Sequence, residues 1–66
     1  MKRVDLIRRI TEEGCVFVRA GSRHDVYRNV ITGATQPIPR HREINEHTAE
    51  GIIRALSTPE QTDRGV

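Results

Sequence analysis

Apolar residues recur with helical spacing at both ends of this chain, and this arrangement constrains the fold more than any other feature of the sequence. The first helix is expected from about residue 3 to Glu13, with Gly14 as its stop. Its apolar face comprises Val4, Leu6, Ile7 and Ile10. The second helix is expected to have Asn45 or Thr48 as its cap. Its apolar face comprises Ala49, Ile52, Ile53 and Leu56. Two amphipathic helices therefore flank the middle of the chain.

The middle of the chain has the composition of three short strands. These segments are CVFVRA (15–20), RHDVYRN (23–29) and ATQPIP (34–39), with turn residues at 21–22 and 29–33. Pro37 and Pro39 lack an N–H donor, so the third strand is expected to lie at a sheet edge or to end early. Alternation along the second strand places His24, Val26 and Arg28 on one side and Arg23, Asp25 and Tyr27 on the other.

Together these elements predict one small α+β domain. Its order is α-β-β-β-α, with a three-stranded antiparallel sheet and both helices on one face. Phe17 is expected in the core and Tyr27 at its edge, and two aromatic residues are too few for a base-stacking platform. The open face of the sheet is left to solvent, RNA or a protein. Residues 1–57 are expected to form the domain, and residues 58–66 a flexible tail.

Chain length and cysteine content exclude several classes of protein. A chain of 66 residues forms a single domain with a small core. Cys15 is the only cysteine, so an internal disulfide and a four-cysteine zinc site are excluded. No apolar run approaches the ~20 residues of a membrane span, and no signal-peptide pattern opens the chain. We therefore expect a cytoplasmic protein with no membrane contact.

Positive charge is concentrated in the middle of the chain and is carried there by arginine. Residues 19–42 contain five arginines and a single acidic residue, Asp25. The planar guanidinium group suits bidentate contacts with phosphate. This pattern favours a nucleic-acid partner, and the alternative is an ordinary solvated charged surface.

His24 lies within this basic segment and is the candidate for proton transfer. Cleavage of RNA without metal uses the 2′-hydroxyl as nucleophile, needs an acid and a base, and needs positive charge at the phosphate. Imidazole suits the proton transfers because both of its forms are populated near neutral pH. The second proton carrier is either His41 or water, and the alternative for His24 is an exposed strand histidine with no role. Histidines 24, 41 and 47 fit no familiar ligand spacing, so neither a metal nor another cofactor is expected.

From about Val4 to Leu56, the chain resembles the HicA (YcfA-like) toxin family. The resemblance rests on GCVFVR, GSRHDVYRN, Thr32-Gly33, PIPRHREI and HTAEGIIRAL, in that order. The chain departs from the usual pattern at three positions. Cys15 replaces an aromatic residue, Arg23 separates Gly21-Ser22 from His24, and His47 replaces a glycine.

This resemblance implies a fold like the double-stranded RNA-binding domain and the activity of an mRNA interferase, the toxin of a type II toxin–antitoxin pair. It implies metal-independent cleavage of mRNA with His24 as the catalytic residue. It also implies neutralisation by a HicB-type antitoxin, with a monomeric toxin inside a larger complex. The residues expected to bind RNA are Arg19, Ser22, Arg23, Arg28, Arg40, His41 and Arg42. Two alternatives are a non-catalytic RNA-binding module of the same fold and a module that binds only a partner protein.

Overall fold

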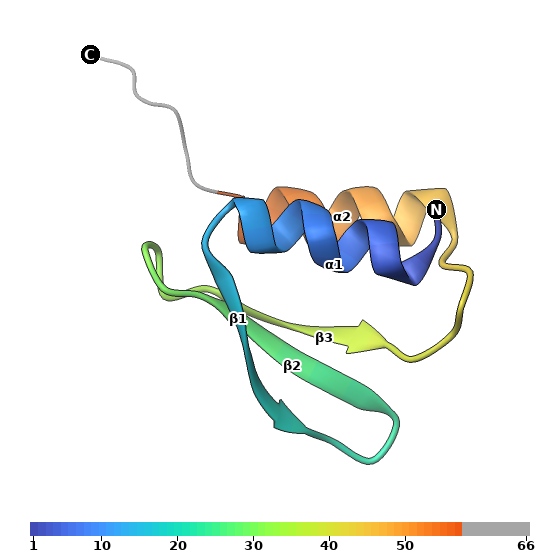
Figure 1. Cartoon of the computed structure of the whole chain (residues 1–66), viewed down its shortest axis with the longest axis horizontal. Helices are drawn as coiled ribbons and strands as arrows, with labels where there is room; N and C mark the ends of the chain where they lie inside the picture. The colour runs from blue at the N-terminus through green and yellow to red at the C-terminus, as the bar shows by residue number, and fades with distance from the viewer. Residues whose placement is uncertain (58–66) are drawn as a thin grey trace.

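Five elements make up the computed structural model, which describes residues 1–57. They are α1 (Arg3–Glu12), β1 (Cys15–Ala20), β2 (His24–Asn29), β3 (Thr35–Pro39) and α2 (Glu46–Leu56). The strands form one antiparallel sheet in the order β1-β2-β3, and both helices lie on the same face of it (Figure 1). The predicted α-β-β-β-α fold is confirmed. The predicted tail, residues 58–66, lies outside the described residues. No helix within residues 1–57 has the length and apolar character needed to span a membrane.

Local sequence signals set the ends of both helices. Gly14 follows α1 with a φ of +99°, a left-handed conformation that glycine adopts without steric penalty. Before α2, Asn45 Oδ1 accepts hydrogen bonds from the backbone N–H groups of His47 at 2.8 Å and Thr48 at 3.3 Å. Asn45 is therefore the N-cap of α2, and Thr48 lies inside the helix.

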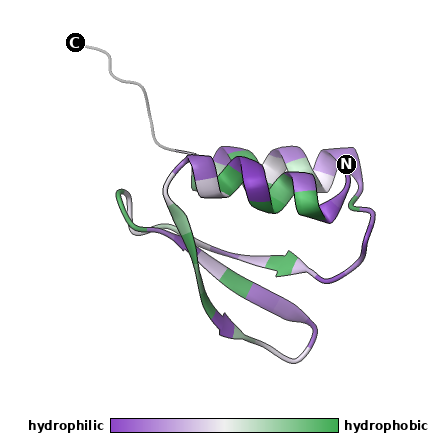
Figure 2. Cartoon of the chain, viewed as in Figure 1, coloured by the Kyte–Doolittle hydropathy of each residue, from purple (hydrophilic) through white to green (hydrophobic). Residues whose placement is uncertain are grey.

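The core lies between the two helices and the inner face of the sheet. Its buried apolar residues are Leu6, Ile10, Cys15, Ile38, Ile44, Ala49, Ile52 and Leu56. The hydrophobic stripes of both helices face the sheet (Figure 2). One residue of the predicted α1 face does not join them, because Val4 is 64% exposed. It lies around the helix from Leu6 and Ile10, beside the basic side chains that surround the start of α1.

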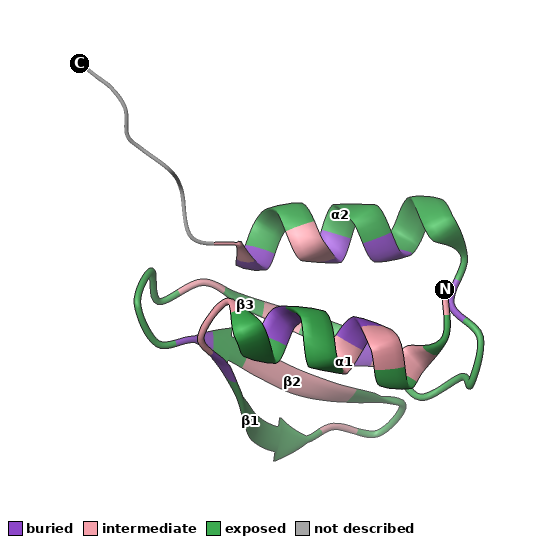
Figure 3. Cartoon of the chain, turned by 45° about the horizontal axis from the view of Figure 1, so that its top comes forward, coloured by how far each residue is buried: buried purple, intermediate pink, exposed green. Residues whose placement is uncertain are grey.

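β1 is more exposed than the sequence indicates. Cys15 is buried, but Val16, Phe17 and Val18 are 47–54% exposed, and the strand runs away from the helices (Figures 1 and 3). The prediction that Phe17 is a core residue is therefore wrong. Its ring packs edge-on against Tyr27, with centroids 5.8 Å apart, and Tyr27 lies at the edge of the core as predicted. A bulge between Phe17 and Arg19 shifts the register of β1 against β2.

β3 is the other edge of the sheet, as its prolines predict. Pro39 pairs with His24 and Pro37 pairs with Val26. The alternation along β2 is also confirmed, because Asp25 and Asn29 both contact the helices on the inner face. His24 and Arg28 are exposed at opposite ends of the strand.

Asn29 joins the ends of both helices to the sheet. Its Nδ2 donates hydrogen bonds to the carbonyl oxygens of Glu13 at 3.0 Å and Leu56 at 2.6 Å. Its Oδ1 accepts from the N–H groups of Ile31 at 2.8 Å and Thr32 at 3.1 Å. A fully buried amide that satisfies groups from three segments fixes the end of the domain away from His24.

Candidate functional site

His24 is the first residue of β2, and its side chain lines a shallow cleft at the β3 edge of the molecule. The cleft has a volume of about 510 Å³. One wall is formed by His24 with Pro37 and Pro39, and the other by the first turns of α2, including His47 and Gly51. This volume lies within the range of about 300–1,000 Å³ that is typical of small-ligand sites.

The turn before His24 is tight and depends on Gly21. The N–H of Gly21 donates a hydrogen bond to the carbonyl oxygen of His24 at 2.7 Å. A Cβ atom added to Gly21 would lie 2.9 Å from that same oxygen, closer than side chains approach a backbone atom. Glycine is therefore required here by the close approach of the two ends of the turn, and this approach sets where β2 begins.

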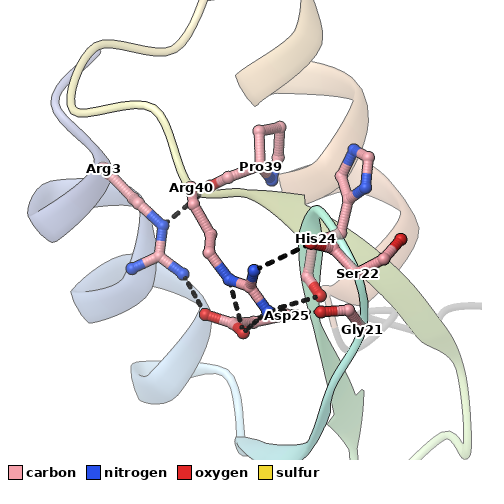
Figure 4. Close-up of polar contacts among 7 residues, drawn as sticks. All are labelled: Arg3, Gly21, Ser22, His24, Asp25, Pro39 and Arg40. Atoms are coloured by element: carbon pink, nitrogen blue, oxygen red, sulfur yellow. Dashed lines mark hydrogen bonds and ion pairs between the residues drawn. The ribbon is translucent and has the colours of Figure 1, made fainter.

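Arg40 binds this turn from the other side (Figure 4). Its Nη2 donates to the carbonyl oxygens of Gly21 at 2.6 Å and His24 at 3.3 Å, and its Nη1 donates to that of Ser22 at 3.3 Å. Its Nε donates to Asp25 Oδ1 at 3.0 Å. A single guanidinium group thus holds three backbone carbonyl groups and one carboxylate. We call Arg3, Asp25 and Arg40 the arginine clamp.

Arg3 completes the clamp from the first turn of α1. Its Nη2 donates to Asp25 Oδ2 at 2.8 Å, and its Nε donates to the carbonyl oxygen of Pro39 at 2.7 Å. The hydrogen bond from Arg40 is the main cause that lowers the pKa of the Asp25 carboxyl, and the positive charge of Arg3 adds to it. The clamp therefore ties α1, the start of β2 and the end of β3 together directly behind His24.

The backbone of His24 is held by the clamp, but its imidazole is not. In Figure 4 the imidazole and the carboxylate of Asp25 point in different directions from neighbouring positions of β2. This separation follows from the alternation of side chains along a strand. The arrangement presents an exposed imidazole on a backbone that is fixed by charged hydrogen bonds.

The other residues predicted to bind RNA are exposed but do not form one cluster. Arg42 and Arg40 line a second hollow of about 620 Å³ at the start of α1, together with Lys2 and Arg3. This hollow is larger than the cleft at His24 but contains no histidine. The remaining predicted residues are all exposed and lie on β1, the following turn, β2 and the segment after β3: Arg19, Ser22, Arg23, Arg28 and His41.

Two features of the site could not be predicted from the sequence. A pairing of Asp25 with one solvated arginine is the ordinary expectation, whereas the structure gives it two arginines and leaves its side chain only 19% exposed. His47 lines the same cleft as His24, although they are far apart in the sequence. A polar residue in the first turn after a helix cap carries no signal of this proximity. Within the described residues, no group of three His, Cys, Asp or Glu side chains could hold a metal ion.

The sequence matches a family of toxins of bacterial toxin–antitoxin systems. The family model described as the HicA toxin of bacterial toxin–antitoxin systems matches residues 4–57, which is most of the chain. The chain therefore belongs to the HicA toxin family, as the resemblance of its motifs indicates. Searches of curated proteins and of solved structures found no match to the chain.

Proposed function

We propose that this toxin is an endoribonuclease that cleaves mRNA without a metal ion and uses His24 for proton transfer. The observation that carries the proposal is the exposed imidazole of His24 in a cleft, on a backbone that the arginine clamp holds in place. Membership of a toxin family supports a damaging activity that a partner must restrain.

His24 would act on the proton of the attacking 2′-hydroxyl or on that of the leaving 5′-oxygen. Such general acid–base catalysis contributes roughly 10²–10⁴-fold in rate. A rigid backbone matters because the imidazole must stay within hydrogen-bond distance of the reacting oxygen. The clamp supplies that rigidity through hydrogen bonds to charged groups, which are stronger than those between neutral groups.

The exposed arginines would bind the RNA backbone. We propose phosphate contacts for Arg19, Arg23, Arg28 and Arg42, with Ser22 and His41 as additional polar contacts. Arg40 would have two roles, because it holds the turn and still leaves 41% of its side chain exposed beside His24. Contacts of this kind read phosphate and shape, so we expect RNA binding to weaken steeply as salt concentration rises.

The test is cleavage of a long RNA by the purified protein in the presence of EDTA. We expect cleavage by the wild type and a loss of at least about 100-fold in His24→Ala. The same variant should still bind RNA, because its arginines are unchanged. Equal cleavage by the wild type and His24→Ala would overturn the catalytic assignment. Salt-sensitive binding without any cleavage would instead support the non-catalytic RNA-binding module.

The partner of this toxin is an antitoxin, and we propose one of the HicB type that covers the cleft at His24. An antitoxin bound there would block RNA from the imidazole of His24. We therefore expect the complex to protect the residues of the cleft from hydrogen exchange and to leave RNA intact. A complex that leaves His24 open to RNA would contradict this mode of inhibition.

A further inference from the structure

We propose that His47 is the second proton-transfer residue, paired with His24 across the cleft. This inference rests on the proposed function, and it supplies the acid or base that one histidine alone leaves missing. His24 belongs to the β2 wall and His47 to the α2 wall of the same cleft. His41 does not line this cleft, although the sequence presents it as the nearer candidate.

The cap of α2 fixes the position of His47. The backbone N–H of His47 donates to Asn45 Oδ1 at 2.8 Å, so the first turn of the helix is ordered where it meets the cleft. Residues 47, 48, 51 and 52 lie on adjacent positions of two helical turns and line the cleft together. Ile52 is buried at the base of this stripe and holds the helix against the sheet.

Gly51 leaves room beside His47. It lies one turn further along the same stripe, and a Cβ atom added there would meet nothing within 4 Å. A glycine inside a helix costs stability relative to alanine. In the proposed site this open position leaves the α2 side of the cleft, next to His47, accessible to a phosphodiester.

The chemistry of the cleft lining favours this pair. Among the described residues that line it, no carboxylate, lysine, cysteine or tyrosine is present, and the remaining polar groups are the side chains of Gln36 and Thr48. Neither a carboxamide nor an aliphatic hydroxyl gains or loses a proton to an appreciable extent near neutral pH, so both are poor general acids and bases. The two imidazoles are therefore the groups of this lining that are suited to acid–base catalysis.

Two histidines account for both proton transfers of the RNA cleavage reaction. As the 2′-oxygen forms its bond to phosphorus, one imidazole takes the proton of the 2′-hydroxyl. The bond between phosphorus and the 5′-oxygen breaks, its electron pair stays on that oxygen, and the other imidazolium donates a proton to it. The products are a 2′,3′-cyclic phosphate end and a 5′-hydroxyl end. Exchange with water then restores the starting protonation states.

The experiment measures kcat and KM for His24→Ala and His47→Ala on two RNA dinucleotides. One has a natural linkage, and the other has sulfur in place of the leaving 5′-oxygen, because a thiolate leaves without needing a proton. We expect His47→Ala to lose about 100-fold or more in kcat on the natural linkage, with little change in KM. One of the two variants should recover on the sulfur linkage, and the other should not. The variant that recovers lacks the acid.

Three results would overturn the inference. They are wild-type kcat in His47→Ala, a loss confined to KM, and a failure of both variants to recover on the sulfur linkage. Glu50→Gln is the matched control on α2, because Glu50 is exposed and does not line the cleft. Its kcat should equal that of the wild type. Thermal midpoints of all variants show whether α2 remains folded.

The inference and the proposed function fail in different ways. If the wild type cleaves RNA and His24→Ala does not, the proposed function holds. The result for His47→Ala then decides whether His47 is the second proton-transfer residue. If the wild type does not cleave RNA, the proposed function is wrong, and a binding measurement decides whether the two histidines share a site. In that case a 3′-nucleotide should shift the NMR signals of both imidazoles with one dissociation constant. A shift of only one signal, or of neither, would overturn the shared site.

Discussion

At the scale of single residues, a few polar side chains determine how this small domain is held together. Asn29 anchors the end distant from the cleft, and the arginine clamp anchors the end near it. Both use side chains to satisfy backbone carbonyl groups that lie outside regular hydrogen-bonding ladders. Substitution of Asn29 and substitution of Arg40 should affect the stability of the domain differently, because Asn29 is fully buried and Arg40 is partly exposed.

Replacement of Asn29 by alanine should destabilise the whole domain. The change leaves the carbonyl oxygen of Glu13 and the N–H groups of Ile31 and Thr32 without this partner. We expect a loss of about 1–3 kcal/mol in the free energy of unfolding, the usual cost of removing one partner from buried hydrogen bonds. Urea unfolding measures the loss. An unchanged free energy of unfolding in Asn29→Ala would contradict this role of Asn29.

Replacement of Arg40 by lysine should loosen the turn before His24 without unfolding the domain. An ammonium group cannot reproduce the planar fork that contacts Asp25 and three carbonyl oxygens at once. We expect faster hydrogen exchange of the Gly21 amide, together with a lower rate of RNA cleavage. Arg8→Lys is the control, because Arg8 makes an exposed contact with Asp5 at 3.3 Å, away from the turn. Unchanged exchange at Gly21 would contradict the role of the clamp.

At the scale of elements, the limits of each helix and strand follow from local sequence, but their degree of burial does not. The predicted signals lie where elements end: Gly14 follows α1, Asn45 caps α2, and the prolines of β3 lie on an edge strand. Phe17 and Val4 are exposed because burial depends on how far the helices extend over the sheet, and no local pattern encodes that distance. The proximity of His47 to His24 has the same origin, since it arises from the packing of α2 over β3.

Replacement of Gly51 by alanine should stabilise α2. The position is exposed, lies inside the helix and has free space around it. We expect the free energy of unfolding to rise by about 0.5–1 kcal/mol because alanine loses less backbone entropy on folding. Thermal or urea unfolding measures the gain. Gly21→Ala is the informative contrast, because its added Cβ would clash with the carbonyl oxygen of His24, and it should lower stability.

At the scale of the whole molecule, one carboxylate connects parts that are distant in the sequence. The carboxylate of Asp25 forms ion pairs with Arg3 of α1 and with Arg40 of the segment after β3. The arginine-rich middle of the sequence indicates a basic surface. It does not indicate that Arg3 and Arg40 both form ion pairs with Asp25, the only acidic residue of residues 19–42. That arrangement requires α1 and the segment after β3 to be packed against the start of β2, and so it is visible only in the folded structure.

Acid should weaken the domain through this connection. The pKa of Asp25 is lowered in the folded state, mainly by its hydrogen bond from Arg40, so its contribution to stability is complete above the ordinary carboxyl pKa of about 4. This contribution is lost as the pH falls through the lower pKa of the folded state. The pKa of Glu43 is lowered by its hydrogen bond from the N-terminal ammonium group, and it acts in the same direction. Unfolding midpoints measured from pH 7 to pH 2 should fall less steeply in Asp25→Asn than in the wild type.

The cleft at His24 has one wall from β2 and one from α2, and α2 is the last of the described elements to leave the ribosome. A nascent chain that ends before Glu46 contains His24, its turn and the arginine clamp, but it lacks the α2 wall of the cleft. Any chemistry that needs both walls therefore begins only when synthesis of the domain is finished and α2 has docked. The order of elements along the chain thus delays the assembly of the cleft until α2 has been synthesised.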